Sequence, residues 1–149
     1  MSDLQRSPAD LAAEGRRVTL RLDLAVNPVP LKRPIVVMPR RPTGRIRAFT
    51  PDPAAFVDEF RWAVKAAGVH APLAGPLRFS AQLWRRCKPR TTRGDLDNHV
   101  KAIWDAGIGF VWEDDSQFVA IGDVAFVEWG PEVVGRIVLE ITQLAKAAG

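Results

Sequence analysis

Two segments far apart in the chain alternate apolar and polar residues, over positions 17–26 and 77–86. The apolar positions are Val18, Leu20, Leu22 and Leu24 in the first segment and Leu77, Phe79, Ala81 and Leu83 in the second. A period of two predicts strands that bury one face. The fold must therefore contain a sheet with one covered side.

Helical patterns lie between and after these strands. Thr50 followed by Pro51 is typical of a helix start, and Gly68 predicts its end. Phe56, Phe60 and Val64 form an apolar stripe at helical spacing. A second helix is predicted over residues 98–106, where Gly107 and Gly109 follow.

The remaining segments complete the predicted order of elements. A short strand is expected at 35–38 and further strands at 117–129 and 135–144, and residues 39–50 are expected to form an irregular basic loop. This order predicts an α/β (α+β) single domain, with a mixed β-sheet of about four or five strands packed against two main helices. We expect residues 1–16 to be a flexible N-terminal arm and residues 17–149 to be the domain.

Charge is distributed unevenly along the chain. Residues 1–93 hold 18 Lys and Arg against 7 Asp and Glu, whereas residues 94–149 hold 3 against 10. A basic body joined to an acidic segment favours a polyanion-binding protein with a cation site, although solvated surface charge is the simpler explanation. No apolar run is long enough to span a membrane or act as a signal peptide. The lone Cys87 fits a reducing compartment, so we expect a cytoplasmic protein.

The acidic segment contains two carboxylate groups. Asp95 and Asp97 flank Leu96, and in an extended segment they point the same way. Helix capping is the simpler role for one of them. The second group is Glu113-Asp114-Asp115, for which a plain surface turn is the simpler explanation.

The path of the chain after the second helix determines whether the two carboxylate groups lie close together. If residues 110–114 run back extended along the helix, Asp115 reaches Asp95 and Asp97. Three adjacent carboxylates repel one another unless a cation compensates. Hard oxygen ligands favour Mg²⁺, with Mn²⁺ as the alternative, and the sequence has no motif for a small-molecule cofactor.

Two further residues near this cluster have open roles. Lys101 lies four residues after Asp97, where it either stabilises a phosphorane or forms a salt bridge to Asp97 or Asp105. His99 is either a base or ligand, or a structural side chain.

With these motifs in place, the chain resembles the RusA-type Holliday junction resolvases, a family common in phages and prophages. The resemblance is carried by Asp95-Leu96-Asp97-Asn98 with Lys101 and Asp105, and by the segment from Val111 to Gln117. The upstream residues 28–34 and the basic loop are also similar, so it covers roughly residues 28–143. His99 and Gly107-Ile108 depart from the family pattern.

The resemblance implies a homodimeric, Mg²⁺-dependent endonuclease that acts on four-way or branched DNA in recombination and repair. It implies that Asp95, Asp97 and Asp115 are the acidic catalytic and metal-binding residues, and that Lys101 is the motif lysine. A branched-DNA or nonspecific nuclease with the same site, and a non-catalytic DNA-binding module, are the alternatives.

A set of basic residues is expected to contact DNA phosphates. They are Lys32, Arg33, Arg40, Arg41, Arg45, Arg47, Arg85, Arg86, Lys88, Arg90 and Arg93.

Overall fold

The computed structural model describes residues 19–31, 35–37, 47–49, 54–89 and 93–144. The strands are β1 (Thr19–Leu24), β2 (Ile35–Val37), β3 (Arg47–Phe49), β4 (Leu77–Arg86), β5 (Phe118–Gly130) and β6 (Arg136–Gln143). The helices are α2 (Ala54–Ala66), α3 (Leu96–Gly107) and the short 3₁₀ helix η2 (Asp115–Gln117). The predicted arm over residues 1–16 lies outside the described residues.

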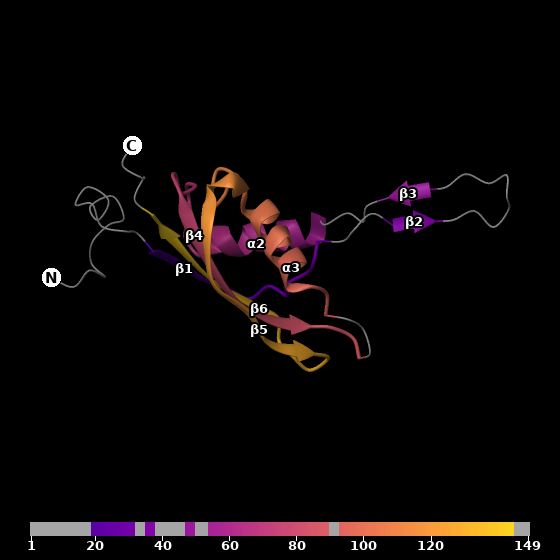
Figure 1. The fold of residues 1–149 in the computed structure, drawn as a ribbon. Coiled ribbons are helices and arrows are strands. Elements are labelled where there is room, and N and C mark those ends of the chain that lie inside the picture. The colour runs from indigo at the N-terminus through magenta and orange to yellow at the C-terminus, as the bar shows by residue number, and fades with distance from the viewer. Residues whose placement is uncertain (1–18, 32–34, 38–46, 50–53, 90–92, 145–149) are drawn as a thin grey trace.

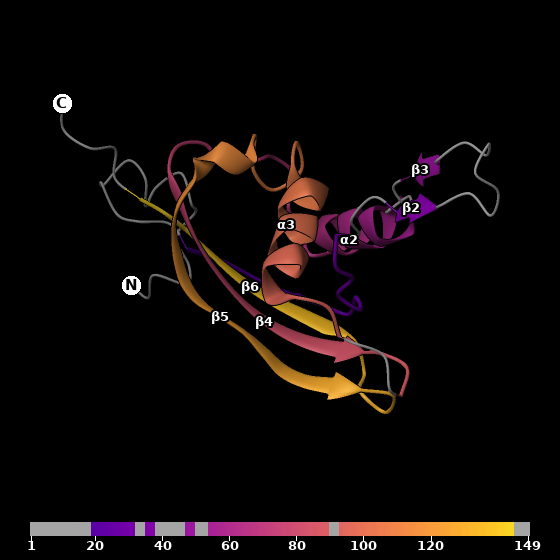
Figure 2. The same cartoon turned by 45° about the vertical axis from the view of Figure 1, so that its right-hand side comes forward.

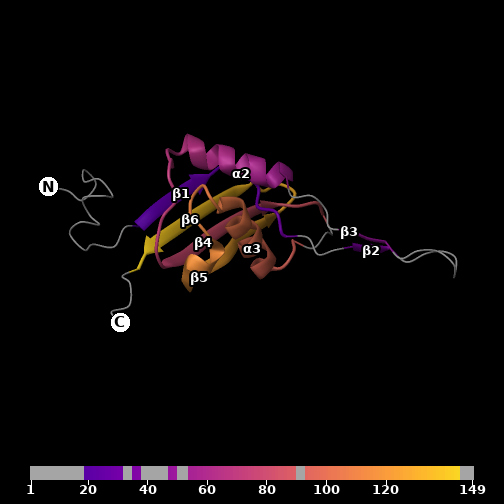
Figure 3. The same cartoon turned by 90° about the horizontal axis from the view of Figure 1, so that it is seen from above.

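Four strands form the main sheet, in the order β1-β6-β4-β5. β6 pairs antiparallel with both β1 and β4, whereas β4 and β5 are parallel. Because β4 and β5 are parallel, both end on the side of the sheet where α3 begins (Figure 2). β2 and β3 form a separate antiparallel ribbon that stands off from the sheet (Figures 1 and 3).

Both long helices cover the same face of the sheet (Figure 3). The apolar residues that alternate along β1, β4 and β6 point toward them and are buried. Phe60 and Val64 of α2 and Ile103 of α3 are completely buried against this layer. The core therefore lies between one sheet face and two helices.

The predicted fold class is confirmed, with a four-stranded mixed sheet and two helices in a single domain. Two local predictions were wrong. The basic loop predicted over residues 39–50 includes β3, whose three residues pair with β2. The second helix begins at Leu96 rather than at residue 98, so Asp97 lies in its first turn.

Gly107, the last residue of α3, lies tightly against the buried Trp112 ring. A Cβ at this position would overlap the ring, which has no room to move because Trp112 is fully buried and its Nε1 donates to the Trp104 carbonyl at 2.9 Å. Alanine usually stabilises a helix relative to glycine. Here we expect Gly107→Ala to lower the free energy of unfolding by about 1–3 kcal/mol, as overpacking does. Urea unfolding measures this, and a stabilised variant would contradict the packing described.

No helix in the described part of the chain is long and apolar enough to cross a membrane.

Candidate functional site

One exposed stripe of α3 carries three charged side chains. Asp97, Lys101 and Asp105 follow one another at intervals of four residues, and all three are exposed. The opposite side of α3 is buried through residues such as Val100 and Ile103. In the described residues no ion pair joins Lys101 to either aspartate, so the salt-bridge role considered for Lys101 is not the one that the structure has.

Asp95 is the N-cap residue of α3, with an extended backbone (φ −76°, ψ 144°). Its side chain makes no capping hydrogen bond, so capping does not explain this carboxylate. The expectation that Asp95 and Asp97 point the same way in an extended segment was wrong, because Asp97 is already helical. The two carboxylates instead mark the first turn of α3, where the helix dipole favours negative charge.

The acidic turn before β5 uses its three carboxylates differently. Asp114 is the N-cap of η2: its carboxylate accepts hydrogen bonds from the Asp115 backbone N–H at 3.0 Å and from the Ser116 hydroxyl at 2.6 Å. These bonds lower the pKa of Asp114. Gln117 completes the cap, because its Oε1 accepts from the Asp114 N–H at 2.8 Å. Asp114 therefore has a structural role, whereas Asp115, the first residue of η2, is exposed, as is Glu113.

Asp115 lies near Asp105 at the C-terminal end of α3. The pKa of Asp105 is raised, first by partial burial and then by the negative charge of Asp115. This placement differs from the extended return expected for residues 110–114. The chain turns at once instead, since the N–H groups of Phe110 and Val111 both donate to the Gly107 carbonyl.

The carboxylates thus form two groups at opposite ends of α3. Asp95 and Asp97 lie at its start and Asp105 and Asp115 at its end, and Asp97 and Asp105 are about 12 Å apart along the axis by the rise of an α-helix. No set of three or more acidic, His or Cys side chains among the described residues is close enough to hold a metal ion. The donor chemistry still fits Mg²⁺, which proteins bind through one or two carboxylates with water and phosphate as the other ligands.

His99 lies beneath the start of α3 and is completely buried. Its Nδ1 lies 2.8 Å from the Asp95 carbonyl oxygen, and because a carbonyl only accepts, Nδ1 carries the proton. The ring packs edge-on against Phe126 with 4.9 Å between centroids. Burial is the main cause that lowers the pKa of His99 to about 4. His99 is therefore neutral, and among its two earlier roles the structure supports a buried side chain rather than an exposed base.

The lowered pKa of His99 predicts a pH dependence of stability. Between about pH 4 and pH 6.5 the unfolded chain binds a proton at this residue that the folded protein does not, so stability falls as the pH falls through that window. The loss is about 3 kcal/mol at most. Urea unfolding above pH 6.5 and near pH 4 should show a smaller loss for His99→Leu than for the wild type. Equal losses would contradict a buried neutral imidazole.

Few of the expected DNA-contacting side chains lie within the described residues. Arg86 is exposed at the end of β4, and Lys88 and Arg93 are exposed in the connection between β4 and α3. The Arg93 guanidinium lies 4.5 Å above the Trp129 ring. Arg85 is half-buried, and its Nη1 donates to the Pro28 carbonyl at 2.6 Å, so its expected phosphate contact stays a prediction.

The other expected contacts lie outside what the structure describes. Side chains are not described for Lys32, Arg33, Arg40, Arg41, Arg45, Arg47 and Arg90.

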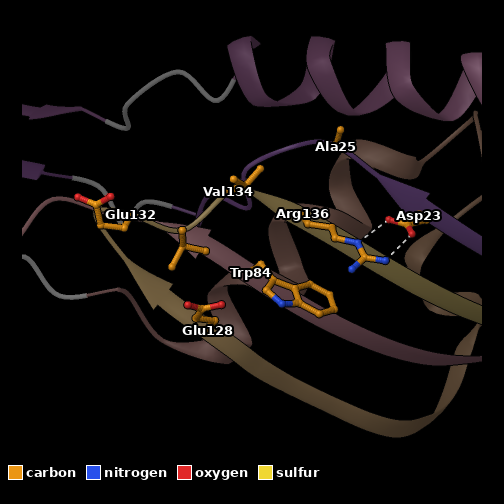
Figure 4. Close-up of a pocket in the computed structure, with 9 residues that line it drawn as sticks. Asp23, Ala25, Trp84, Glu128, Glu132, Val134 and Arg136 are labelled. Carbon is orange, nitrogen blue, oxygen red and sulfur yellow. Dashed lines mark hydrogen bonds and ion pairs between the residues drawn. The ribbon is translucent and has the colours of Figure 1, made fainter.

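A hollow of 520 Å³ lies on the sheet face away from the helices (Figure 4). Asp23 and Arg136 form a bidentate ion pair at its edge, with N–O distances of 2.8 and 2.6 Å. Arg136 also lies 4.6 Å over the Trp84 ring. None of the predicted site residues lines this hollow, so it is separate from the acidic face of α3.

Two residues that the sequence analysis did not assign belong to the acidic region. Asp105 was considered as a partner for Lys101 and as part of the family motif but was given no place in the site, although its spacing of eight residues from Asp97 puts both on one helical face. Gln117 ties η2 to the preceding linker, because its Nε2 donates to the carbonyls of Leu73 and Gly75 at 2.9 Å each. Nothing in the local sequence signals that contact, since its partners lie more than 40 residues away.

The comparison with protein families gives a match over most of the chain. The family model described as Endodeoxyribonuclease RusA matches residues 25–142. This range contains β4, β5, both helices and all of β6 except its last residue, whereas β1 lies just before it. No curated protein matches the chain.

Proposed function

The chain belongs to the endodeoxyribonuclease RusA family, and from this premise we propose that it resolves Holliday junctions by Mg²⁺-dependent hydrolysis of two phosphodiester bonds. Membership makes the protein an endodeoxyribonuclease. The observation that supports metal-dependent junction cleavage is the exposed acidic face of α3, on which Asp97, Lys101 and Asp105 are aligned. Asp95 and Asp115 extend this face at its two ends.

We assign Asp95 and Asp97 as metal ligands at the start of α3 and Asp115 as a metal ligand at its other end, because the two groups are too far apart in this structure to share one ion. The carboxylate of Asp95 is not used in capping. The pKa of Asp105 is raised first by partial burial and then by the negative charge of Asp115, and a bound cation would relieve this repulsion. Bound Mg²⁺, with Mn²⁺ as a substitute, would polarise the phosphodiester and lower the pKa of the attacking water.

Lys101 is the proposed cationic catalytic residue. It stands between Asp97 and Asp105 on the same face, with its side chain exposed. From there its ammonium group stabilises the negative charge that develops on the phosphoryl oxygens in the transition state. It needs no proton transfer for this role.

In this proposal DNA is bound by Arg86 at the end of β4, by the basic residues of the β4–α3 connection and by those of the segments outside the described residues. Arg86, Lys88 and Arg93 lead directly into Asp95, so phosphates held there approach the carboxylates. We expect Arg86→Ala to weaken junction binding and to lower the slope of log affinity against log salt by about one. Fluorescence anisotropy over a salt series measures both, and an unchanged slope would contradict a phosphate contact.

A homodimer with two active sites would cut opposing strands symmetrically, as resolution of a four-way junction requires. Sedimentation velocity at assay concentrations tests this assembly, and a monomer that still makes paired cuts would contradict it. We place the protein in the cytoplasm, where its single cysteine stays reduced.

The choice of substrate tests the proposal against a less specific nuclease. Four-way, three-way and linear DNA of matched sequence are offered at equal concentration with Mg²⁺. We expect rapid cleavage of the four-way junction and little cleavage of the linear duplex. Equal rates on all three substrates would favour a nonspecific nuclease, and junction binding without cleavage in any divalent metal would favour a non-catalytic module.

A further inference from the structure

His99 is a polar side chain that the packing of α3 does not require. It is fully buried, and its Nε2 has no hydrogen-bond partner among the described residues. Its contact with Phe126 is one that an apolar side chain of similar size would also make. A buried nitrogen without a partner costs stability. The imidazole therefore needs an explanation other than core packing.

The imidazole of His99 donates its hydrogen bond to Asp95, which is a proposed metal ligand. The Asp95 carbonyl accepts the His99 backbone N–H at 3.3 Å, and the imidazole Nδ1–H at the shorter distance of 2.8 Å. The helix already has its backbone bond, so the ring adds a second restraint on the same peptide group. That peptide group sets the direction in which the Asp95 side chain leaves the chain.

Gly94 brings a second contact between the ring and this turn. Its φ of +87° suits glycine, and a Cβ there would come within 3.1 Å of His99 Cε1 and 3.0 Å of Pro30 Cγ. The backbone thus passes directly over the ring just before Asp95. The segment that contains Pro30 is also tied to α3, since the Leu31 backbone N–H donates to the Asn98 carbonyl at 2.9 Å.

We propose that His99 is a positioning residue for Asp95: its imidazole holds the N-terminal turn of α3 so that the Asp95 carboxylate is aimed for metal binding. The inference rests on the proposed function of Asp95. His99 touches neither metal nor DNA, and it acts through the Asp95 peptide group.

Two substitutions separate positioning from packing. His99→Leu keeps an apolar contact with Phe126 and removes the donor, whereas His99→Asn keeps an amide donor that can reach the carbonyl four residues earlier. We expect His99→Leu to unfold at a temperature no lower than the wild type, to bind Mn²⁺ about 10-fold more weakly by calorimetry, and to lower kcat by about 10- to 100-fold. His99→Asn should restore Mn²⁺ affinity and kcat toward wild-type values, even where its melting temperature is lower.

Phe126→Leu is the matched control, because it loosens the packing beside His99 without removing the hydrogen bond. It should lower the melting temperature and leave Mn²⁺ affinity unchanged. The inference is overturned if His99→Leu keeps wild-type Mn²⁺ affinity and kcat, or if all three variants lose affinity in proportion to their lost stability. If His99→Leu does not fold, the inference is tested with His99→Asn and Phe126→Leu alone. It is overturned if both lose Mn²⁺ affinity in proportion to their lost stability. A wild-type protein that neither binds Mn²⁺ nor cleaves overturns the proposed function and this inference together.

Discussion

The Asp97→Asn variant is expected to bind a four-way junction at least as tightly as the wild type and to cleave it about 10³-fold more slowly or worse, since several kcal/mol of metal-dependent stabilisation are lost. Binding should survive because the substitution removes a negative charge near the DNA and leaves the basic residues intact. The fold should also survive, because Asp97 is exposed in the first turn of α3.

Asp58→Asn provides the matched control for this loss. Asp58 is an exposed aspartate of α2, so the substitution makes the same chemical change on a helix outside the acidic face. Single-turnover cleavage and gel-shift assays on one labelled junction measure both variants. Cleavage by Asp97→Asn at the wild-type rate would remove Asp97 from the proposed site.

Asparagine substitution of the two neighbouring aspartates Asp114 and Asp115 should have very different effects on the cleavage rate. Asp115→Asn is expected to lower the cleavage rate about 10²-fold or more, because it removes a proposed metal ligand. Asp114→Asn should change the rate by no more than about threefold, since asparagine caps a helix as well as aspartate does. The Ser116 hydroxyl, which now donates to Asp114, can instead accept from the new amide.

The pKa of Asp105 is a second, independent measurement on the Asp114 and Asp115 variants. The charge of Asp115 helps to raise the pKa of Asp105, so Asp115→Asn should lower that pKa toward its ordinary value of 3.8. Asp114→Asn should leave it nearly unchanged. Side-chain NMR titration of Asp105 measures both without any DNA. Equal effects of the two substitutions on cleavage would contradict the separate tasks that we assign to Asp114 and Asp115.

The main fold could be predicted because its signals are local and periodic. Leu77 and Phe79 alternate with polar residues in a strand, and Phe56 and Phe60 repeat at helical spacing, so burial pattern alone located β4 and α2. β3 was missed because its three residues lie within a run of arginines, and the pairing with β2 that makes it a strand is not visible locally.

The acidic residues could be named from the sequence, but their arrangement could not. Residues 110–114 are apolar and acidic, which suggests an extended return, yet tertiary contacts override this pattern. Trp112 is drawn into the core and donates to the Trp104 carbonyl, so the chain folds back at once beside Asp105. The buried role of His99 likewise depends on Phe126, which is distant in sequence.

Cleavage of a synthetic mobile four-way junction by the wild-type protein, with Mg²⁺ and with the metal removed by EDTA, tests the central claim most directly. We predict paired, symmetric cuts in opposing strands with Mg²⁺ and intact, protein-bound junction in EDTA. Cleavage that persists in EDTA, or a junction that stays intact in both Mg²⁺ and Mn²⁺, would contradict a metal-dependent junction resolvase.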